Sequence, residues 1–219
     1  MPAQAVLFDL DGTLLDTLAD IAGAANAALA REGVPEHPVD SYRQFIGDGV
    51  DMLFRRALPP VAGHDDDRVA RCVAHFHDTY AASWNVASAP YEGIAELLDA
   101  LVDRGLTLAI LSNKPDEFTK LCANHYLGRW PWARVVGQRV GIPRKPDPTP
   151  ALMIADELQI FPGRITYVGD SSVDMRTARA ATMPAVGVSW GFRPVEELRA
   201  AGATAIIDRP LDLLPLLDA

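Results

Sequence analysis

Cysteine and basic residues are scarce in this sequence. Its 219 residues include only two cysteines, Cys72 and Cys122, which lie far apart in the chain. We therefore expect no disulfide framework and interpret them as separate thiols in a reducing compartment. Lys and Arg number 20 against 29 Asp and Glu, and the formal net charge is −9. Because nucleic acids bind to basic surfaces, this balance argues against a nucleic-acid partner.

A long apolar run is also missing. No stretch approaches the roughly 20 apolar residues that span a bilayer, and residues 1–4 lack the charged n-region of a signal peptide. We therefore expect a soluble, cytoplasmic protein with no membrane partner. Apolar residues still make up 49% of the chain, which is enough for a sizeable core in one domain, or in a core domain with a smaller insertion.

Short apolar runs alternate with helical patterns through most of the chain. The first run, 5–8, ends directly before Asp9 and is typical of a parallel strand buried on both faces. Further strands are expected at 106–111, 135–136, 165–168, 185–188 and 205–207. Helical patterns lie between them at 93–104, 116–126, 149–158 and 172–181. From about residue 90 onward, this alternation predicts an α/β sheet of βαβ units.

Residues 16–84 interrupt this alternation. Apolar residues recur at helical spacing over 18–30, with Asp16 or Thr17 as a plausible N-cap and Gly33 just past the end. Further helices are expected at 40–45, 49–57 and 65–83, and no strand-like run lies among them. The simplest interpretation is an all-helical insert after the first strand of the sheet.

Two carboxylates, Asp9 and Asp11, follow the first expected strand in the run FDLDGT at 8–13. Ligands of open α/β sheets bind beyond the carboxyl ends of the strands. Carboxylates placed there repel each other unless a cation or a proton lies between them, and Gly12 offers a sharp turn and an unhindered N–H to an anion. Such a site suits phosphoryl transfer, in which one carboxylate attacks phosphorus and the other exchanges protons. The alternative is a solvated turn that caps a helix.

Polar residues also end the second expected strand and occupy a proline-rich loop. The hydroxyl of Ser112 and the adjacent Asn113 stand at a strand end, where successive N–H groups can bind an anion. The alternative for Ser112 is a helix N-cap. Pro146 and Pro148 stiffen the backbone around Lys145, so this lysine can act as a fixed charge for phosphate. The alternative is a lysine on a surface loop.

A second acidic pair, Asp170 and Asp174, follows the strand expected at 165–168. The two residues are four apart, so both can face one site. Carboxylates at strand ends suit Mg²⁺, which also contacts substrate phosphate. Four such segments, each at the carboxyl end of an expected strand, are hard to obtain by accident, and together they predict a magnesium-dependent phosphate site.

With these motifs the chain resembles the haloacid dehalogenase superfamily of phosphatases and, within it, the phosphoglycolate phosphatase group. The run DLDGT at 9–13 matches the family's Asp-x-Asp-Gly-Thr signature, and the resemblance covers nearly the whole chain. It implies a doubly wound, Rossmann-like parallel sheet formed by 1–16 and 85–219. A helical C1-type cap, inserted at 17–84, would close over the site, exclude water and supply substrate contacts.

The resemblance also implies a role for each matched residue. Asp9 would be the nucleophile and Asp11 the general acid and base. Mg²⁺ would be held by Asp9, Asp170 and the backbone carbonyl of Asp11, and Asp174 would help through a bound water or by pairing with Lys145. The transferred phosphate would be held by Ser112, Asn113 and Lys145. Because the dehalogenases and phosphonate hydrolases of this kind lack an acid at position 11, Asp11 favours phosphate ester chemistry.

Two features of the expected cap concern substrate recognition. Gly47 and Gly49 flank Asp48 in a segment that resembles the glycine-containing loop lowered onto substrate by a cap of this type. An ordinary turn between helices is the alternative. Arg43, four residues earlier, could bind a substrate carboxylate through two parallel hydrogen bonds, whereas the alternative is a surface arginine.

We therefore predict a phosphoric monoester hydrolase that acts on a small, phosphoglycolate-like ester through an aspartyl-phosphate, as a monomer or homodimer. A phosphosugar mutase or a pyrophosphatase of the same superfamily stays open. A phospho-receiver domain is disfavoured, because receivers are shorter and usually lack a helical insert. A non-catalytic binding protein is disfavoured because every matched catalytic position is filled, and no G-x-G-x-x-G supports a dinucleotide-binding oxidoreductase.

Overall fold

The computed structural model describes residues 2–218. The chain divides into two compact units. The first contains Met1–Leu15 and Pro90–Ala219, and the second contains Asp16–Ala89. Where the chain passes between the units, two short strands, β2 (Leu15–Asp16) and β3 (Ala89–Pro90), pair with each other.

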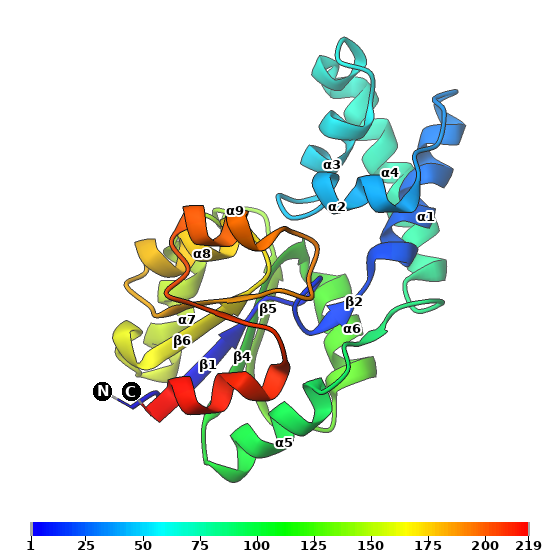
Figure 1. Ribbon diagram of the computed structural model, residues 1–219. Helices are drawn as coiled ribbons and strands as arrows, with labels where there is room; N and C mark the ends of the chain where they lie inside the picture. The colour runs from blue at the N-terminus through cyan, green and yellow to red at the C-terminus, as the bar shows by residue number, and fades with distance from the viewer. Residues whose placement is uncertain (1, 219) are drawn as a thin grey trace. The chain divides into compact units, whose positions relative to one another are not determined.

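The first unit is built on a six-stranded sheet (Figure 1). In spatial order its strands are β5 (Trp132–Gln138), β4 (Thr107–Pro115), β1 (Ala5–Phe8), β6 (Ile165–Gly169), β7 (Ala185–Val188) and β8 (Ala205–Ile207). All neighbouring pairs are parallel. The chain adds strands on one side of β1 and then crosses to the other side, which is the doubly wound, Rossmann-like order. The predicted fold class is confirmed.

Helices cover both faces of this sheet (Figure 1). One face shares a core cluster with three helices: α7 (Thr149–Leu158), α8 (Ser172–Ala180) and α9 (Val195–Ala201). The other face lies against α5 (Ile94–Asp103), α6 (Asp116–Leu127) and the C-terminal 3-10 helix η4 (Pro210–Asp218). A short 3-10 turn, η3 (Pro162–Arg164), precedes β6. Because helices lie on both faces, the central strands are continuous apolar runs rather than alternating ones.

The register of the central strands brings three strand ends together. Phe8, the last residue of β1, pairs with Ile110 of β4 on one side and with Val168 of β6 on the other. All of β1 is buried, which its apolar sequence allows. Asp9, Leu111 and Gly169, which follow these three positions, therefore lie next to one another at the carboxyl edge of β1.

The second unit is helical. Its elements are α1 (Leu18–Arg31), η1 (Val39–Ser41), α2 (Tyr42–Phe45), α3 (Val50–Ala57), η2 (Ala62–His64) and α4 (Asp66–Ser83). The two longest helices, α1 and α4, pack against each other, and α3 packs on α4. The N-cap of α4 is Asp65, whose side chain accepts a hydrogen bond from the Arg68 N–H at 3.1 Å.

One buried carboxylate joins the two ends of this unit. Asp20, in the first turn of α1, is only 7% exposed. It accepts backbone hydrogen bonds of 2.9–3.1 Å from Val86, Ala87 and Ser88, and the Ser88 hydroxyl donates to it at 2.6 Å. Since a carboxylate is expensive to bury without donors, these bonds fix the segment before β3 to the start of α1.

The main expected elements of the first unit agree with the structure, with the following exceptions. β4 runs to Pro115, beyond its expected end at residue 111. β5 runs over seven residues, whereas the sequence predicts only 135–136, because the exposed Arg134 of this edge strand interrupts the apolar run. α9 is short, with seven residues, and η4 contains Pro215, so neither has the periodicity that predicts a helix. No helix in the described part of the chain has the length and apolarity of a membrane span.

Candidate active site

The candidate site lies where β4, β1 and β6 end. Asp9 directly follows β1, and Asp170 directly follows β6. β4 extends through Pro115, so Ser112 and Asn113 lie inside the strand, just before its last two residues. Since these three strands are neighbours in the parallel sheet, their carboxyl ends bring residues from distant parts of the sequence to one place.

Three acids form a compact buried cluster at this edge. Asp9, Asp170 and Asp174 each offer a carboxylate oxygen, and these atoms all lie within 4.8 Å of one another. One oxygen of Asp170 accepts the Phe192 N–H at 2.7 Å. Buried like charges at this spacing need a cation or a proton between them, and an all-oxygen donor set suits Mg²⁺. The residues present therefore fit a divalent cation.

Lys145 lies against the same cluster. Its Nζ is 2.9 Å from Asp9 Oδ1 and 2.7 Å from Asp174 Oδ1, and it donates to the Leu111 carbonyl at 3.1 Å. Burial would lower the pKa of this ammonium, but the adjacent Asp174 and Asp9 outweigh burial and hold the pKa well above its usual value. With only 3% of the residue exposed, the alternative of a surface-loop lysine is wrong.

Asp174 is held by several donors of the protein. Its Oδ2 accepts the Ser171 hydroxyl at 2.5 Å and the Ser171 N–H at 3.1 Å. The second of these bonds and the Asp174 N–H, which donates to the Ser171 hydroxyl at 3.4 Å, make a capping box at the start of α8. Its Oδ1 accepts Lys145 Nζ and, at 3.3 Å, the Tyr167 hydroxyl. Because both oxygens already take protein donors, this geometry favours pairing with Lys145 over direct binding of a metal.

The Asn113 side chain bonds to the backbone of the lysine loop. Its Nδ2 donates to the Lys145 carbonyl at 3.0 Å, and the Lys145 N–H donates to its Oδ1 at 3.0 Å. This two-way bond ties the end of β4 to the loop that carries Lys145. The Ser112 hydroxyl accepts the Lys114 N–H at 3.2 Å. Because α6 begins only at Asp116, with Pro115 as its N-cap, the alternative that Ser112 caps this helix is wrong.

Lys114 is a site residue that the motif analysis misses. Its Nζ lies 3.1 Å and 3.3 Å from the two carboxylate oxygens of Asp11. Successive side chains of a strand point to opposite faces, so residues 112 and 114 share one face. That alternation, applied to the run Ser112-Asn113-Lys114, is the signal that could have found it.

Glycine is required at position 12 for two reasons. Gly12 has a φ of +84°, which side-chain-bearing residues rarely adopt. A Cβ atom there would also lie 2.3 Å from Asp170 Oδ2. The carboxylate of Asp170 therefore occupies the space that a side chain would need. The loop 190–192 closes this corner, since Trp190 Nε1 donates to the Thr13 carbonyl at 3.0 Å.

Burial makes the acids of the cluster hard to ionise without a cation. Burial and the nearby Asp174 raise the pKa of Asp9 from 3.8 to about 7, although Lys145 opposes the shift. Burial, Asp174 and Asp9 raise the pKa of Asp170 well above its usual value. A bound divalent cation inverts this tendency, because it favours the ionised carboxylates.

Arg43 and Gly49 belong to the second unit. Arg43 lies in α2 and pairs with Asp40, with 3.2 Å between Nε and Oδ1. Gly49 is the N-cap of α3, and the neighbouring Asp48 forms an ion pair with Arg56. Contact of Arg43 and Gly49 with a substrate stays a prediction.

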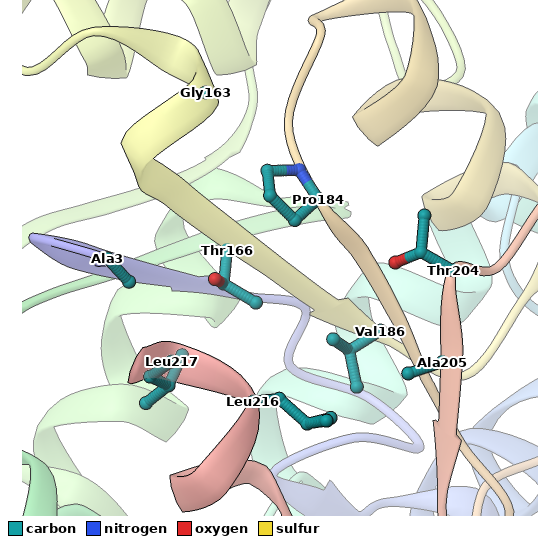
Figure 2. A pocket seen from close by; sticks show the side chains of 9 residues that line it. All are labelled: Ala3, Gly163, Thr166, Pro184, Val186, Thr204, Ala205, Leu216 and Leu217. Carbon is teal, nitrogen blue, oxygen red and sulfur yellow. The ribbon is translucent and has the colours of Figure 1, made fainter. Parts of the chain in front are cut away.

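A separate cavity lies at the opposite edge of the sheet. It has a volume of about 260 Å³, and most of the side chains around it are apolar (Figure 2). Its walls include residues at or beside the starts of β6, β7 and β8: Thr166, Pro184, Val186, Thr204 and Ala205. The cavity is therefore not part of the site formed by the carboxyl ends.

Known proteins match this chain over most of its length. The model of the haloacid dehalogenase-like hydrolase family matches residues 6–188. Phosphoglycolate phosphatase 1 of Pseudomonas aeruginosa is 33% identical over 217 residues, which cover 97% of this chain and 79% of that protein. N-acetylmuramic acid 6-phosphate phosphatase of the same organism is 35% identical over 222 residues, which cover 100% of this chain and 96% of that protein.

A solved structure is similar as well. The crystal structure of a predicted phosphoglycolate phosphatase from Haemophilus somnus superposes with a TM-score of 0.90 at 26% identity. The match covers 98% of this chain and 97% of that one. The fold of this chain is therefore similar to that of a known structure of this kind.

Proposed function

The chain belongs to the haloacid dehalogenase-like hydrolase family, and we propose that it hydrolyses a small phosphomonoester through a phosphorylated Asp9. The observation that carries the proposal is the position of the Asp9 carboxylate. It lies at a strand end, 2.9 Å from a buried ammonium and within a cluster of acids that fits a divalent cation. A carboxylate in such surroundings is suited to attack a phosphate that the same positive charges hold.

In the first step, a carboxylate oxygen of Asp9 attacks phosphorus. The bond from phosphorus to the ester oxygen breaks, and its electron pair stays on that oxygen. Asp11 gives its proton to the leaving oxygen, so that the product departs as an alcohol. Asp9 then carries the phosphoryl group as an acyl phosphate.

In the second step, water attacks the phosphorus of this acyl phosphate. Asp11, now a carboxylate, takes a proton from the water. The bond from phosphorus to the Asp9 oxygen breaks, and the electron pair restores the Asp9 carboxylate. Inorganic phosphate leaves, and both acids are back in their starting protonation states.

Placement and charge neutralisation supply most of the catalysis in such a transfer. The phosphate would be held by the Lys145 ammonium and the Ser112 hydroxyl. The Gly12 N–H donates to the Leu15 carbonyl at 2.8 Å, so the expected contact of this N–H with an anion is disfavoured. The carboxylates of Asp9 and Asp170 and the backbone carbonyl of Asp11 would hold Mg²⁺, which, when bound, neutralises charge on the phosphoryl group. The hydrogen bonds between the Asn113 side chain and the Lys145 backbone support a role for Asn113 in holding the lysine loop in place.

The substrate is proposed to be a small ester such as phosphoglycolate. The two named relatives carry the names of different phosphate esters at nearly equal identity, 33% and 35%, so the ester must be chosen by assay. The helical second unit is proposed to act as a cap that excludes water, with Arg43 and Gly49 contacting the substrate.

The direct test measures phosphate release from a panel of phosphomonoesters and pyrophosphate, with Mg²⁺ and with EDTA. We expect release from a small monoester, lost in EDTA and abolished in Asp9→Asn. Asp156→Asn, a change of the same kind on the exposed side of α7, is the matched control and should keep full activity. Turnover by a folded Asp9→Asn protein would contradict the role of Asp9.

The intermediate can be trapped with Asp11→Ala. A p-nitrophenyl ester needs little help in leaving, so this variant should transfer phosphate to Asp9 but hydrolyse it slowly. Mass spectrometry should then locate one phosphoryl group on the peptide that contains residue 9. Conversion of a sugar phosphate to its isomer without phosphate release would instead identify a mutase.

A further inference from the structure

We infer that Lys114 is a positioning residue, which holds the Asp11 carboxyl group in the orientation needed to protonate the leaving oxygen. The inference rests on the proposed function, because it assumes the proton-donor role of Asp11. It adds a second lysine to the site, with a task separate from that of Lys145.

The contact between Lys114 and Asp11 involves both carboxyl oxygens and is buried. Lys114 Nζ reaches both oxygens of the Asp11 carboxyl group, at 3.1 Å and 3.3 Å. The Lys114 side chain is 4% exposed and that of Asp11 is 10% exposed. A donor shared by both oxygens restrains the rotation of the carboxyl group about its last bond. Burial strengthens this restraint, because the attraction of an ammonium group for carboxyl oxygens is weakly screened in the protein interior.

The backbone of Lys114 is itself fixed. Its N–H donates to the Ser112 hydroxyl at 3.2 Å, and its carbonyl accepts the Thr119 hydroxyl at 3.1 Å. A Cβ atom on Gly137 of β5 would lie 2.7 Å from the same carbonyl, so the two backbones pack closely. Ordering a lysine side chain costs rotamer entropy. Because the backbone at the end of β4 is already fixed, only the side-chain torsions of Lys114 remain to be ordered.

The two buried lysines divide the acids of the site between them. Lys145 lies against Asp9 and Asp174, whereas Lys114 lies against Asp11. Removing the Lys114 ammonium therefore leaves the nucleophile and its lysine in place. The attack on phosphorus should persist, and the protonation of the leaving oxygen should suffer.

The leaving group separates these two effects. We would compare phosphoglycolate, 2-hydroxyethyl phosphate and p-nitrophenyl phosphate as substrates of the full chain. Both alkyl esters need a proton on the leaving oxygen, whereas p-nitrophenolate departs without one because it is a weak base. For Lys114→Met we expect kcat/KM to fall about 10²-fold for both alkyl esters, the loss typical of a misplaced catalytic group. For p-nitrophenyl phosphate we expect a fall of no more than about threefold, since its leaving oxygen needs no acid.

Two further variants serve as controls. Lys114→Arg keeps the charge and should recover most of the alkyl ester activity. Lys120→Met removes an exposed ammonium that pairs with Asp116 on α6, and should leave all three rates unchanged. If Lys114→Met does not fold, as judged by circular dichroism, Lys114→Gln is used instead and is compared with Lys114→Arg on the same three esters.

Three results would overturn the inference. Equal losses on all three esters would assign Lys114 a general structural role. A loss confined to phosphoglycolate would assign it to recognition of the substrate carboxylate. Unchanged rates would remove it from the site. Failure of the proposed function is seen separately, in the wild-type protein, as no phosphate release from any of the esters.

Discussion

The close fit between Gly12 and Asp170 leads to a quantitative prediction for Gly12→Ala. The new Cβ atom would lie 2.3 Å from Asp170 Oδ2 and 2.8 Å from its Cγ. An ordinary carbon–oxygen contact needs about 3.3 Å, so the carboxylate must move by about 1 Å. It cannot simply retreat, because the Phe192 N–H holds the same oxygen at 2.7 Å and the backbone of Gly191 packs against the Asp170 side chain.

Two costs follow from this geometry. Alanine at a φ of +84° adds backbone strain of about 1–2 kcal/mol. Losing the Phe192 hydrogen bond leaves buried polar atoms unsatisfied, which costs about 1–3 kcal/mol more. We therefore expect the free energy of unfolding to fall by about 2–5 kcal/mol in Gly12→Ala.

Gly105→Ala is the matched control. Gly105 has a φ of +73°, but a Cβ atom there meets nothing within 4 Å. This variant carries the backbone strain without the collision, so its free energy of unfolding should fall by only about 1–2 kcal/mol. The difference between the two variants measures the collision at position 12, which is mainly with Asp170 and also with Phe192 Cδ2 at 3.0 Å.

Urea unfolding in EDTA measures both variants without a cation. Adding Mg²⁺ should then stabilise the wild type and Gly105→Ala by mass action, but should stabilise Gly12→Ala much less. The value of kcat/KM should fall by about 10²-fold or more in Gly12→Ala only. Equal unfolding free energies and equal Mg²⁺ responses in the two variants would refute the reasoning.

Two other predictions concern the charges of the site. In metal-free protein, burial raises the pKa of Asp9 from 3.8 to about 7, so the native state keeps a proton that the unfolded chain has lost. The free energy of unfolding should therefore fall as pH rises from about 4 to about 7. Asp9→Asn should make this slope shallower in EDTA but should not remove it, because the pKa of Asp170 is raised as well. An unchanged slope would assign it to groups other than Asp9. Lys145→Met removes the ammonium shared by Asp9 and Asp174 and should lower kcat at least about 10²-fold, whereas wild-type rates would remove Lys145 from the site.

The sequence predicts the acidic cluster well because strand ends are local signals. Asp9 and Asp170 each directly follow a buried apolar strand, and parallel strands place such residues at one edge. No knowledge of distant contacts is needed to expect that they meet. The same reasoning predicts the position of Ser112 near them.

Contacts between distant residues leave no comparable signal. The Lys114–Asp11 pair joins positions 103 residues apart. Nothing in the sequence near either residue predicts that the two side chains are in contact. The Phe192 N–H that holds Asp170 belongs to the backbone, so any residue except proline could supply it. The two hydrogen bonds between the Asn113 side chain and the Lys145 backbone cannot be predicted from the sequence either, although the sequence places both residues at the site.

The Asp20 clasp has a consequence for how the helical unit could change over time. Its hydrogen bonds to Val86, Ala87 and Ser88 hold the entrance and the exit of the unit together within the unit itself. The first unit therefore needs only two neighbouring segments of chain at which the helical unit can be inserted. Helices α2, α3 and α4 could accordingly be lengthened, trimmed or exchanged, and selection for new ligands could act there without disturbing the strand ends that carry out the chemistry.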